Sequence, residues 1–239
     1  MKTDVTQGHV ILSFNDSLVQ LRGMVLEMGA LVVEQIKDAV RSLLERDPVL
    51  AHQVIDRDRQ VDQFDLLADE AVMRMIATRA PVGIDLRLIH SLARIVIDLE
   101  RAGDEAERIA QYTNRVLQNT GTPPEEKMLQ DVHKTMKLAC CMLESSLDVV
   151  ARNDVECAMK LIQDDPTLDQ EFDAGVRYLS IHQDPDSITM VLNIIFILKA
   201  LERIGDHTKN ICESVIFVDR SKDIRHHKLQ EPSAEKTPP

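Results

Sequence analysis

Two segments of this sequence repeat one another at a fixed distance. Residues 95–104 read IVIDLERAGD and residues 197–206 read ILKALERIGD, so six letters, including both acids of an E-x-x-x-D motif, recur at an offset of 102. A second match, at an offset of 107, pairs four residues of one segment with four of another: Asp58, Val61, Asp62 and Gln63 with Asp165, Leu168, Asp169 and Gln170. Such repetition indicates a duplicated structural unit. The chain is therefore predicted to contain two diverged copies of one unit.

Apolar residues recur every three or four positions through most of the chain, which is the pattern of amphipathic helices. The predicted helices cover roughly residues 15–46, 48–78, 85–119, 125–152, 154–182 and 187–218. Asp47 followed by Pro48 is a typical helix start. Pro166 is expected to kink or restart the fifth helix, because proline lacks the backbone donor that a helix interior needs. The predicted fold class is all-α, with six long helices in a tandem duplication of a three-helix bundle.

The strongest break in the helical pattern is the Gly-Thr-Pro-Pro run at residues 121–124. We therefore predict a first three-helix unit over residues 1–120 and a second over residues 121–218. Residues 219–239 are polar and include three prolines, so this segment is predicted to be a disordered tail.

Composition excludes several classes of function. The net charge of −12 opposes binding to nucleic acid or anionic lipid, and aromatic residues are too scarce, at 3%, for stacking on single strands. No stretch approaches the roughly 20 apolar residues of a membrane span, and Lys2, Asp4 and Gln7 interrupt any signal-peptide pattern. The four cysteines form no C-x-x-C pair. We expect a cytoplasmic protein with no nucleic-acid partner and no direct membrane insertion.

Each predicted unit carries one D-x-x-x-D and one E-x-x-x-D motif. Residues four apart lie on one face of a helix, and like charges there cost about 0.2 to 0.5 kcal/mol per pair, so four such pairs favour a compensating cation. Carboxylate ligands suit hard ions such as magnesium, calcium, manganese or iron. The candidate ligands are Asp58 with Asp62, Glu100 with Asp104, Asp165 with Asp169, and Glu202 with Asp206.

The same acids are also compatible with a solvated face that is tied up in helix ion pairs. Arg108 lies four residues after Asp104, and Arg101 lies four residues before Glu105. The second copy has Asn210 where the first has Arg108. Gly103 and Gly205 each cost about 1 kcal/mol in a helix interior relative to alanine. A close helix approach, or room for an ion, explains both glycines.

The run Leu-Glu-Arg-Ile-Gly-Asp-His at residues 201–207, followed by Asn210 and Ile211, resembles the PhoU family of phosphate-signalling proteins. The first copy, at residues 98–104, matches the same E(D)-x-x-x-D hallmark, and the resemblance covers about residues 10–218. It implies a duplicated three-helix bundle with metal ions (magnesium, manganese, iron or zinc) on the repeated acids. Arg108 and Pro166 depart from a symmetric pattern, so equal metal occupancy of the two units is not expected.

The resemblance also implies a function and partners. It implies a cytoplasmic, homodimeric negative regulator of the phosphate-starvation response, which links the ATPase subunit of the high-affinity phosphate ABC transporter to a sensor histidine kinase. Two alternatives remain open: a metal-free helical scaffold that uses its acidic faces to contact partners, and a carboxylate-bridged di-metal oxidase. The oxidase is disfavoured because the sequence has no Glu-x-x-His motif. No catalytic motif is found, so no enzymatic activity is predicted.

Overall fold

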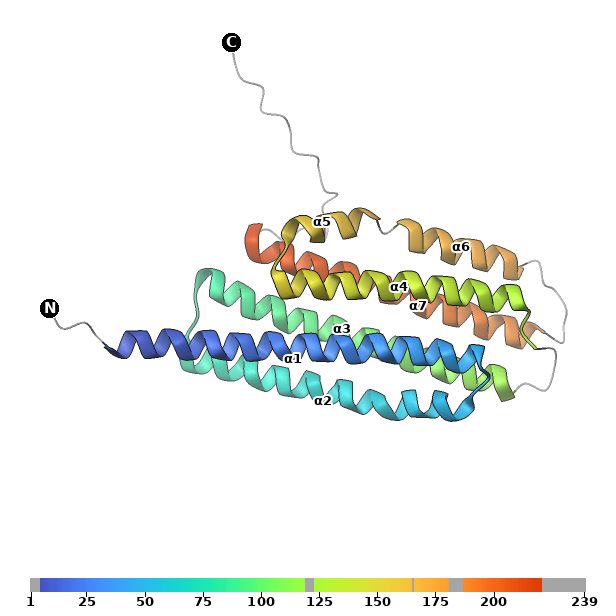
Figure 1. Cartoon of the computed structure of the whole chain (residues 1–239), viewed down its shortest axis with the longest axis horizontal. Helices are drawn as coiled ribbons and strands as arrows, with labels where there is room; N and C mark the ends of the chain where they lie inside the picture. Colours follow the sequence, from blue (N-terminus) through green and yellow to red (C-terminus); the bar gives the residue numbers. More distant parts are fainter. Residues whose placement is uncertain (1–4, 119–122, 165, 181–186, 221–239) are drawn as a thin grey trace, which may run out of the picture.

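The computed structural model describes residues 5–118, 123–164, 166–180 and 187–220, and in these ranges the chain forms seven α-helices that run nearly along one axis (Figure 1). Their bounds are α1 Val5–Leu44, α2 Pro48–Arg79, α3 Gly83–Gln118, α4 Glu126–Arg152, α5 Val155–Asp164, α6 Pro166–Ser180 and α7 Ile188–Arg220. The predicted all-α class is confirmed. The predicted boundary near residue 121 and most of the predicted tail lie outside the described residues, and the division into domains stays a prediction.

The helix starts and stops have local causes. The Asp47 carboxylate accepts hydrogen bonds from the backbone N–H groups of Val49 (2.9 Å) and Leu50 (3.0 Å) and so caps α2, with Pro48 in its first turn. At the other end of α2, Ala80 adopts a left-handed conformation (φ 44°), and its N–H donates to the Ile76 carbonyl at 3.0 Å. These contacts fix the turns on either side of α2.

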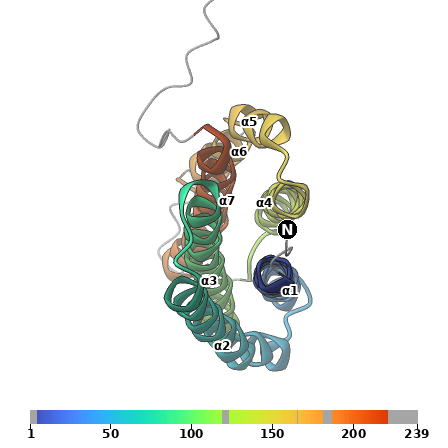
Figure 2. The same ribbon diagram turned by 90° about the vertical axis from the view of Figure 1, so that its left-hand side faces the viewer.

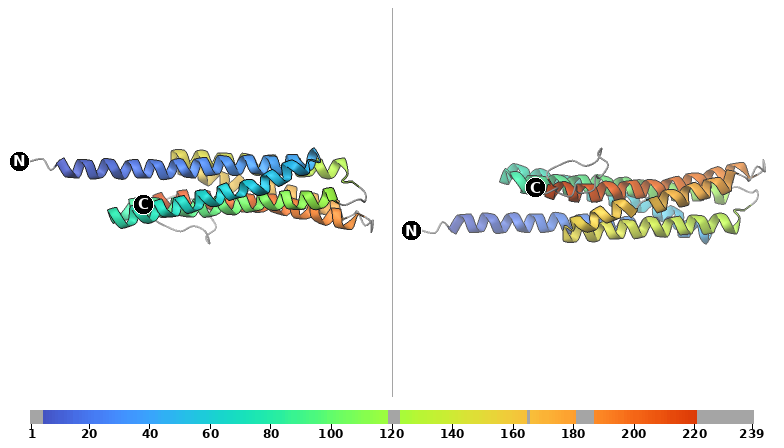
Figure 3. Two further views of the ribbon diagram at one scale, coloured as in Figure 1. Left: turned by 90° about the horizontal axis from the view of Figure 1, so that it is seen from below. Right: turned by 90° about the horizontal axis from the view of Figure 1, so that it is seen from above.

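Two helices differ from the sequence expectation. The predicted fifth helix is two helices in the structure: α5 ends at Asp164 and α6 begins at Pro166, which is the restart expected from the missing backbone donor of proline. Helix α1 begins at Val5, about ten residues before the predicted start. The helix continues through Asn15 and Asp16, where the predicted helix begins. The N-terminal end of α1 extends past its neighbours (Figure 3).

Both repeat units contribute to one hydrophobic core. Helices α1, α2 and α3 pack on one another, α4, α5 and α6 pack on α7, and the two groups meet where α3 lies against α7 and α1 against α4 (Figure 2). One continuous cluster of buried residues runs through both groups, from Leu21 and Val25 in α1 to Cys212 and Ile216 in α7. The units therefore pack as parts of one body.

Buried polar groups join α3 to α7 within this core. Asp98, which is only 6% exposed, accepts a hydrogen bond from the Asn210 amide at 2.9 Å and contacts His207 Nδ1 at 3.1 Å. About two turns further along α3, the carboxylate of Glu105, which is 3% exposed, pairs with Arg203 of α7 at 3.0 Å. A buried carboxylate needs hydrogen-bond donors, and α7 supplies them to Asp98 and Glu105 in only one alignment of the two helices. These contacts therefore define the register of α3 on α7.

Candidate metal centre

The acids of the first unit lie along the seam between α2 and α3. Asp58 and Asp62 stand one turn apart on α2, while Glu100 and Asp104 stand one turn apart on α3. Asp58, Glu100 and Asp104 are partly buried, and Asp62 is exposed. The periodic apolar residues of α2 and α3 face the core, so the acidic faces of the two helices meet at its edge.

Three carboxylates converge on one point of this seam. Oxygen atoms of Asp58, Asp104 and Glu107 all lie within 4.8 Å of one another. Asp58 Oδ1 is buried and has no hydrogen-bond partner. At this separation, and with an effective dielectric constant of about 20, each pair of charged carboxylates repels by about 3 kcal/mol. A cation at this point would give the buried oxygen a partner and would remove the repulsion.

The crowding of carboxylates raises pKa values in the seam. The pKa of Asp58 is raised to about 7, first by burial and then by the charges of Glu107, Asp62 and Asp104. Burial also raises the pKa of Glu100, with added contributions from Asp104, Asp65 and Asp62. The acids of the seam therefore act on one another, and they favour either a shared proton or a bound cation.

Glu107 is a site residue that the sequence reasoning missed. It lies three residues after Asp104 and hence on the same helix face. The repeat itself concealed it, because the offset of 102 places Lys209 at the matching position of the second copy. Asp65, which contributes to the charge around Glu100, was also missed and has Phe172 at its matching position. Residues that differ between the copies are not found by matching the copies.

Gly103 explains how α2 and α3 come close enough to build the site. A Cβ atom at this position would lie 3.1 Å from Val61 Cγ1 and 3.3 Å from Asp58 Oδ1, closer than ordinary van der Waals contact. The missing side chain therefore leaves space that the Asp58 carboxylate occupies. The close helix approach that the sequence suggested is present at Gly103, while Gly205 is buried in α7.

Two of the corresponding acids of the second unit, Glu202 and Asp206, pair with lysines. Glu202 and Asp206 lie on α7, Asp169 is exposed on α6, and Asp165 lies outside the described residues. Lys199 contacts Glu202 at 2.5 Å, and Lys209 contacts Asp206 at 3.4 Å. Burial, Glu202 and Asp169 raise the pKa of Asp206, although its side chain is 53% exposed, and Lys199 and His207 lower it. These two lysines place positive charge beside Glu202 and Asp206, as a bound metal ion would.

Ion pairing in the first unit differs from the sequence expectation. Arg108 donates to Glu105 at 2.5 Å and reaches Asp104 only at 4.0 Å, where both side chains are about 40% exposed. Such an exposed pair contributes little. Glu105 pairs with Arg108 and with Arg203 of α7, rather than with Arg101. Arg108 therefore pairs mainly with Glu105 rather than with Asp104.

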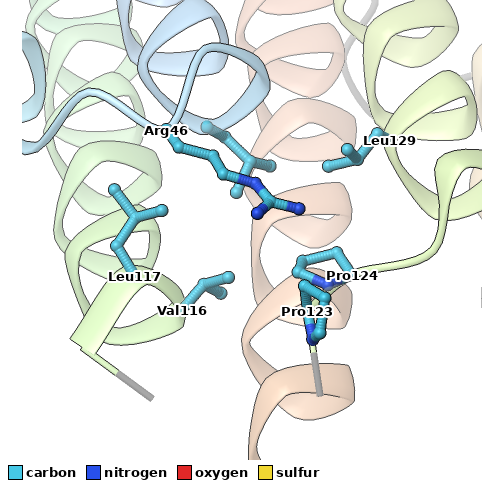
Figure 4. A pocket seen from close by; sticks show the side chains of 7 residues that line it. Arg46, Val116, Leu117, Pro123, Pro124 and Leu129 are labelled. Atoms are coloured by element: carbon cyan, nitrogen blue, oxygen red, sulfur yellow. The ribbon is translucent and has the colours of Figure 1, made fainter. Parts of the chain in front are cut away.

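Another hollow, at the junction of the two units, has different chemistry. Its volume is about 270 Å³, and the Arg46 side chain points into it (Figure 4). The other lining residues are apolar: Leu43, Val116, Leu117, Pro123, Pro124 and Leu129. A lining with one cation and no carboxylate gives a metal ion no ligand, so the α2–α3 seam remains the candidate centre.

In the metal-free protein, stability is expected to fall as the pH rises from about 4 to about 7. Over this range the folded Asp58, with its pKa raised from 3.8 to about 7, holds a proton that the unfolded chain has released. Glu100 and Asp206 shift in the same direction. With chelator present, the Tm should be higher at pH 5 than at pH 7.5. Asp58→Asn should reduce this difference in Tm. The same difference in Tm in the wild-type chain and in the variant would contradict the raised pKa of Asp58.

The donor set fits a hard divalent ion. It offers carboxylate oxygens from two helices, one of them buried without a partner, and neither histidine nor cysteine takes part. Such oxygen-only sets suit magnesium or manganese better than a closed structural zinc site. Asp62 and Glu100, one turn away on each helix, extend the set along the seam.

Known proteins of one family resemble this chain along most of its length. The sequence profile of the PhoU domain matches residues 25–113 and 132–215, which is most of both units. The chain belongs to the PhoU family. A phosphate-specific transport system accessory protein PhoU homolog of Pseudomonas putida is 39% identical over 229 residues, covering 95% of this chain and 88% of the relative. The PhoU accessory protein of Escherichia coli (strain K12) is 33% identical over 220 residues, covering 91% and 90%.

Solved PhoU structures share the fold. The crystal structure of PhoU from Pseudomonas aeruginosa, 39% identical, matches with a TM-score of 0.82 over 87% of this chain and 100% of that one. The phosphate transport system regulatory protein PhoU from Streptococcus pneumoniae, 26% identical, matches with a TM-score of 0.80 over 88% and 98%. Among the described residues, no helix of this PhoU-family chain combines the length and apolar content needed to cross a membrane.

Proposed function

We propose that this chain is an accessory protein of phosphate transport that represses the phosphate-starvation response from the cytoplasm. It contacts the ATPase subunit of the high-affinity phosphate ABC transporter and a sensor histidine kinase, couples the two by protein contact, and so modulates phosphate uptake. Support comes from membership of the PhoU family and from relatives that are named as accessory proteins of the phosphate-specific transport system. Its net charge of −12 favours reaching the membrane through these proteins rather than through anionic lipid.

The second part of the proposal is a metal ion in the α2–α3 seam. The observation that carries it is the convergence of Asp58, Asp104 and Glu107, with Asp58 Oδ1 buried and unpartnered. Bound there, an ion of magnesium, manganese, iron or zinc neutralises the acids and holds α2 against α3. Asp62 and Glu100 extend the site. The second set, Asp165, Asp169, Glu202 and Asp206, binds more weakly, because Lys199 pairs with Glu202 and Lys209 with Asp206.

The protein acts by binding rather than by catalysis. Its relatives are named accessory or regulatory proteins, and the seam presents carboxylates without a paired nucleophile and base. Long helices with apolar stripes are also suited to a homodimer, the commonest soluble assembly. The metal then sets the shape of the acidic α2–α3 face that partners contact.

A phosphate-starvation reporter tests the regulatory role. In cells that lack the native gene, the wild-type chain should restore repression at high phosphate and should retain the transporter ATPase subunit and the kinase in a pull-down. The variant Asp58→Asn with Glu107→Gln, checked for helicity, should repress less. Full repression by this variant would favour the metal-free scaffold, and failure of the wild-type chain to retain either partner would contradict the coupling role.

A further inference from the structure

A buried amide in α1 lies behind the acidic seam without a partner. Gln35 is completely buried (0% exposed), and both its Nε2 and its Oε1 lack a hydrogen bond. Buried side-chain polar groups are nearly always hydrogen-bonded, so an amide with neither atom satisfied requires an explanation. Asp58 Oδ1, in the adjacent helix, is buried and unpartnered in the same way.

The packing of α1 on α2 brings these two groups together. Arg57 donates to the buried Asp38 carboxylate at 3.0 Å, and Arg41 also contacts Asp38, at 2.9 Å. Gln35 lies one turn before Asp38 on α1, and Asp58 directly follows Arg57 on α2. The ion pair therefore fixes a register of α1 on α2 in which Gln35 and Asp58 lie on the facing sides of the two helices, next to the Arg57–Asp38 contact.

We propose that Gln35 is a positioning residue of the metal centre: its Nε2 donates to the Asp58 carboxylate and so orients that carboxylate toward a hard divalent cation. This inference rests on the metal site proposed above. It accounts for a fully buried amide in α1, where Val32, Val33 and Ile36 are buried beside it. Carboxylates that bind metals are themselves held by hydrogen bonds from surrounding residues, and losing such a residue costs about 10- to 100-fold in metal affinity.

The Gln35 amide is a hydrogen-bond donor to Asp58 rather than a ligand of the metal ion. An ionised carboxylate can only accept hydrogen bonds, so of the two unpartnered Gln35 atoms it is Nε2 that can pair with Asp58 Oδ1. A donor and a direct ligand predict opposite results for Gln35→Glu. If Gln35 is a donor, Gln35→Glu replaces the donor with a repelling charge behind Asp58 and weakens metal binding. If Gln35 is a direct ligand, the added negative charge makes metal binding tighter.

The test is a calorimetric titration of the full chain with Mn²⁺, together with thermal unfolding of each protein in chelator. Gln35→Met is expected to weaken Mn²⁺ binding about 10- to 100-fold, while the Tm of the metal-free protein stays the same or rises, because the substitution also removes the buried Oε1, which has no partner. Ser91→Ala is the matched control. Ser91 is also buried with an unpartnered hydroxyl, nine residues from Glu100 on α3, and its loss should leave Mn²⁺ affinity unchanged.

The outcomes separate this inference from the metal site itself. No Mn²⁺ binding by the wild-type chain would overturn the proposed metal site and the role of Gln35 with it. Wild-type binding with unchanged affinity in Gln35→Met would overturn the role of Gln35 alone, as would tighter binding by Gln35→Glu. Weaker binding accompanied by a lower Tm in chelator would show that Gln35 is a packing residue and would also contradict the proposal.

Discussion

Glu107→Lys is expected to abolish metal binding at the first unit while raising the Tm of the metal-free protein. The substitution copies the second unit, where Lys209 stands at the matching position and contacts Asp206 at 3.4 Å. At a separation of about 5 Å and a dielectric constant of about 20, reversing one unit charge beside a cation changes the binding energy by more than about 3 kcal/mol. That corresponds to a loss of more than about 100-fold in affinity. Mn²⁺ titration and thermal unfolding in chelator measure the two effects.

Two further variants control this result. Glu107→Gln removes one charge without adding another, so its loss of affinity should be smaller than that of Glu107→Lys. Lys209→Glu makes the reciprocal change and should give the second unit a measurable site beside Glu202 and Asp206. Wild-type Mn²⁺ affinity in Glu107→Lys would show that the ion, if present, lies elsewhere.

Asp98→Ala is expected to lower the free energy of unfolding by about 2 to 4 kcal/mol, because it leaves buried donors without an acceptor. The Asp98 carboxylate is 6% exposed and is shared by the Asn210 amide and His207, which both belong to α7. Loss of this acceptor weakens the contact between α3 and α7 that joins the two units. Urea unfolding, followed by far-ultraviolet circular dichroism, measures the change.

The conservative variant separates hydrogen bonding from charge. Asp98→Asn keeps an acceptor oxygen for Asn210, so it should destabilise the protein less than Asp98→Ala. Both variants should still unfold in a single transition, because one core spans both units. A change below about 0.5 kcal/mol in Asp98→Ala, the level of an ordinary surface substitution, would contradict the importance of this contact.

The fold could be predicted because its signals are local. Asp47 and Pro48 fix the start of α2 through hydrogen bonds within one turn, and Pro166 divides the fifth predicted helix through its own missing N–H. The early start of α1 was missed because Asn15 and Asp16 are acceptable both as a cap and as exposed helix residues. The packing of α3 against α7 depends on partners more than one hundred residues apart, such as Asp98 and Asn210, and no periodicity reveals it.

The candidate site could be predicted only in part. The motifs identified Asp58 and Asp104 because they recur, but Glu107 has no acidic counterpart in the second copy and is found only when α2 and α3 are seen together. Gln35 belongs to a third helix and carries no charge, so no motif includes it. The alternative interpretation of the acids paired Arg108 with Asp104, but Glu105 competes for this arginine from the adjacent position. The carboxylate with which an arginine pairs depends on side-chain geometry, and the spacing of residues in the sequence does not determine that geometry.

The most direct test of a metal ion on the α2–α3 seam is elemental analysis of the chain purified without chelator or affinity metal. It should be measured beside the variant Asp58→Asn, Asp104→Asn, Glu107→Gln, with helicity checked by circular dichroism. We expect a bound divalent or iron-type metal in the wild-type chain and its loss from a variant that remains folded. Absence of metal from the wild-type chain, or equal metal in both proteins, would contradict the account.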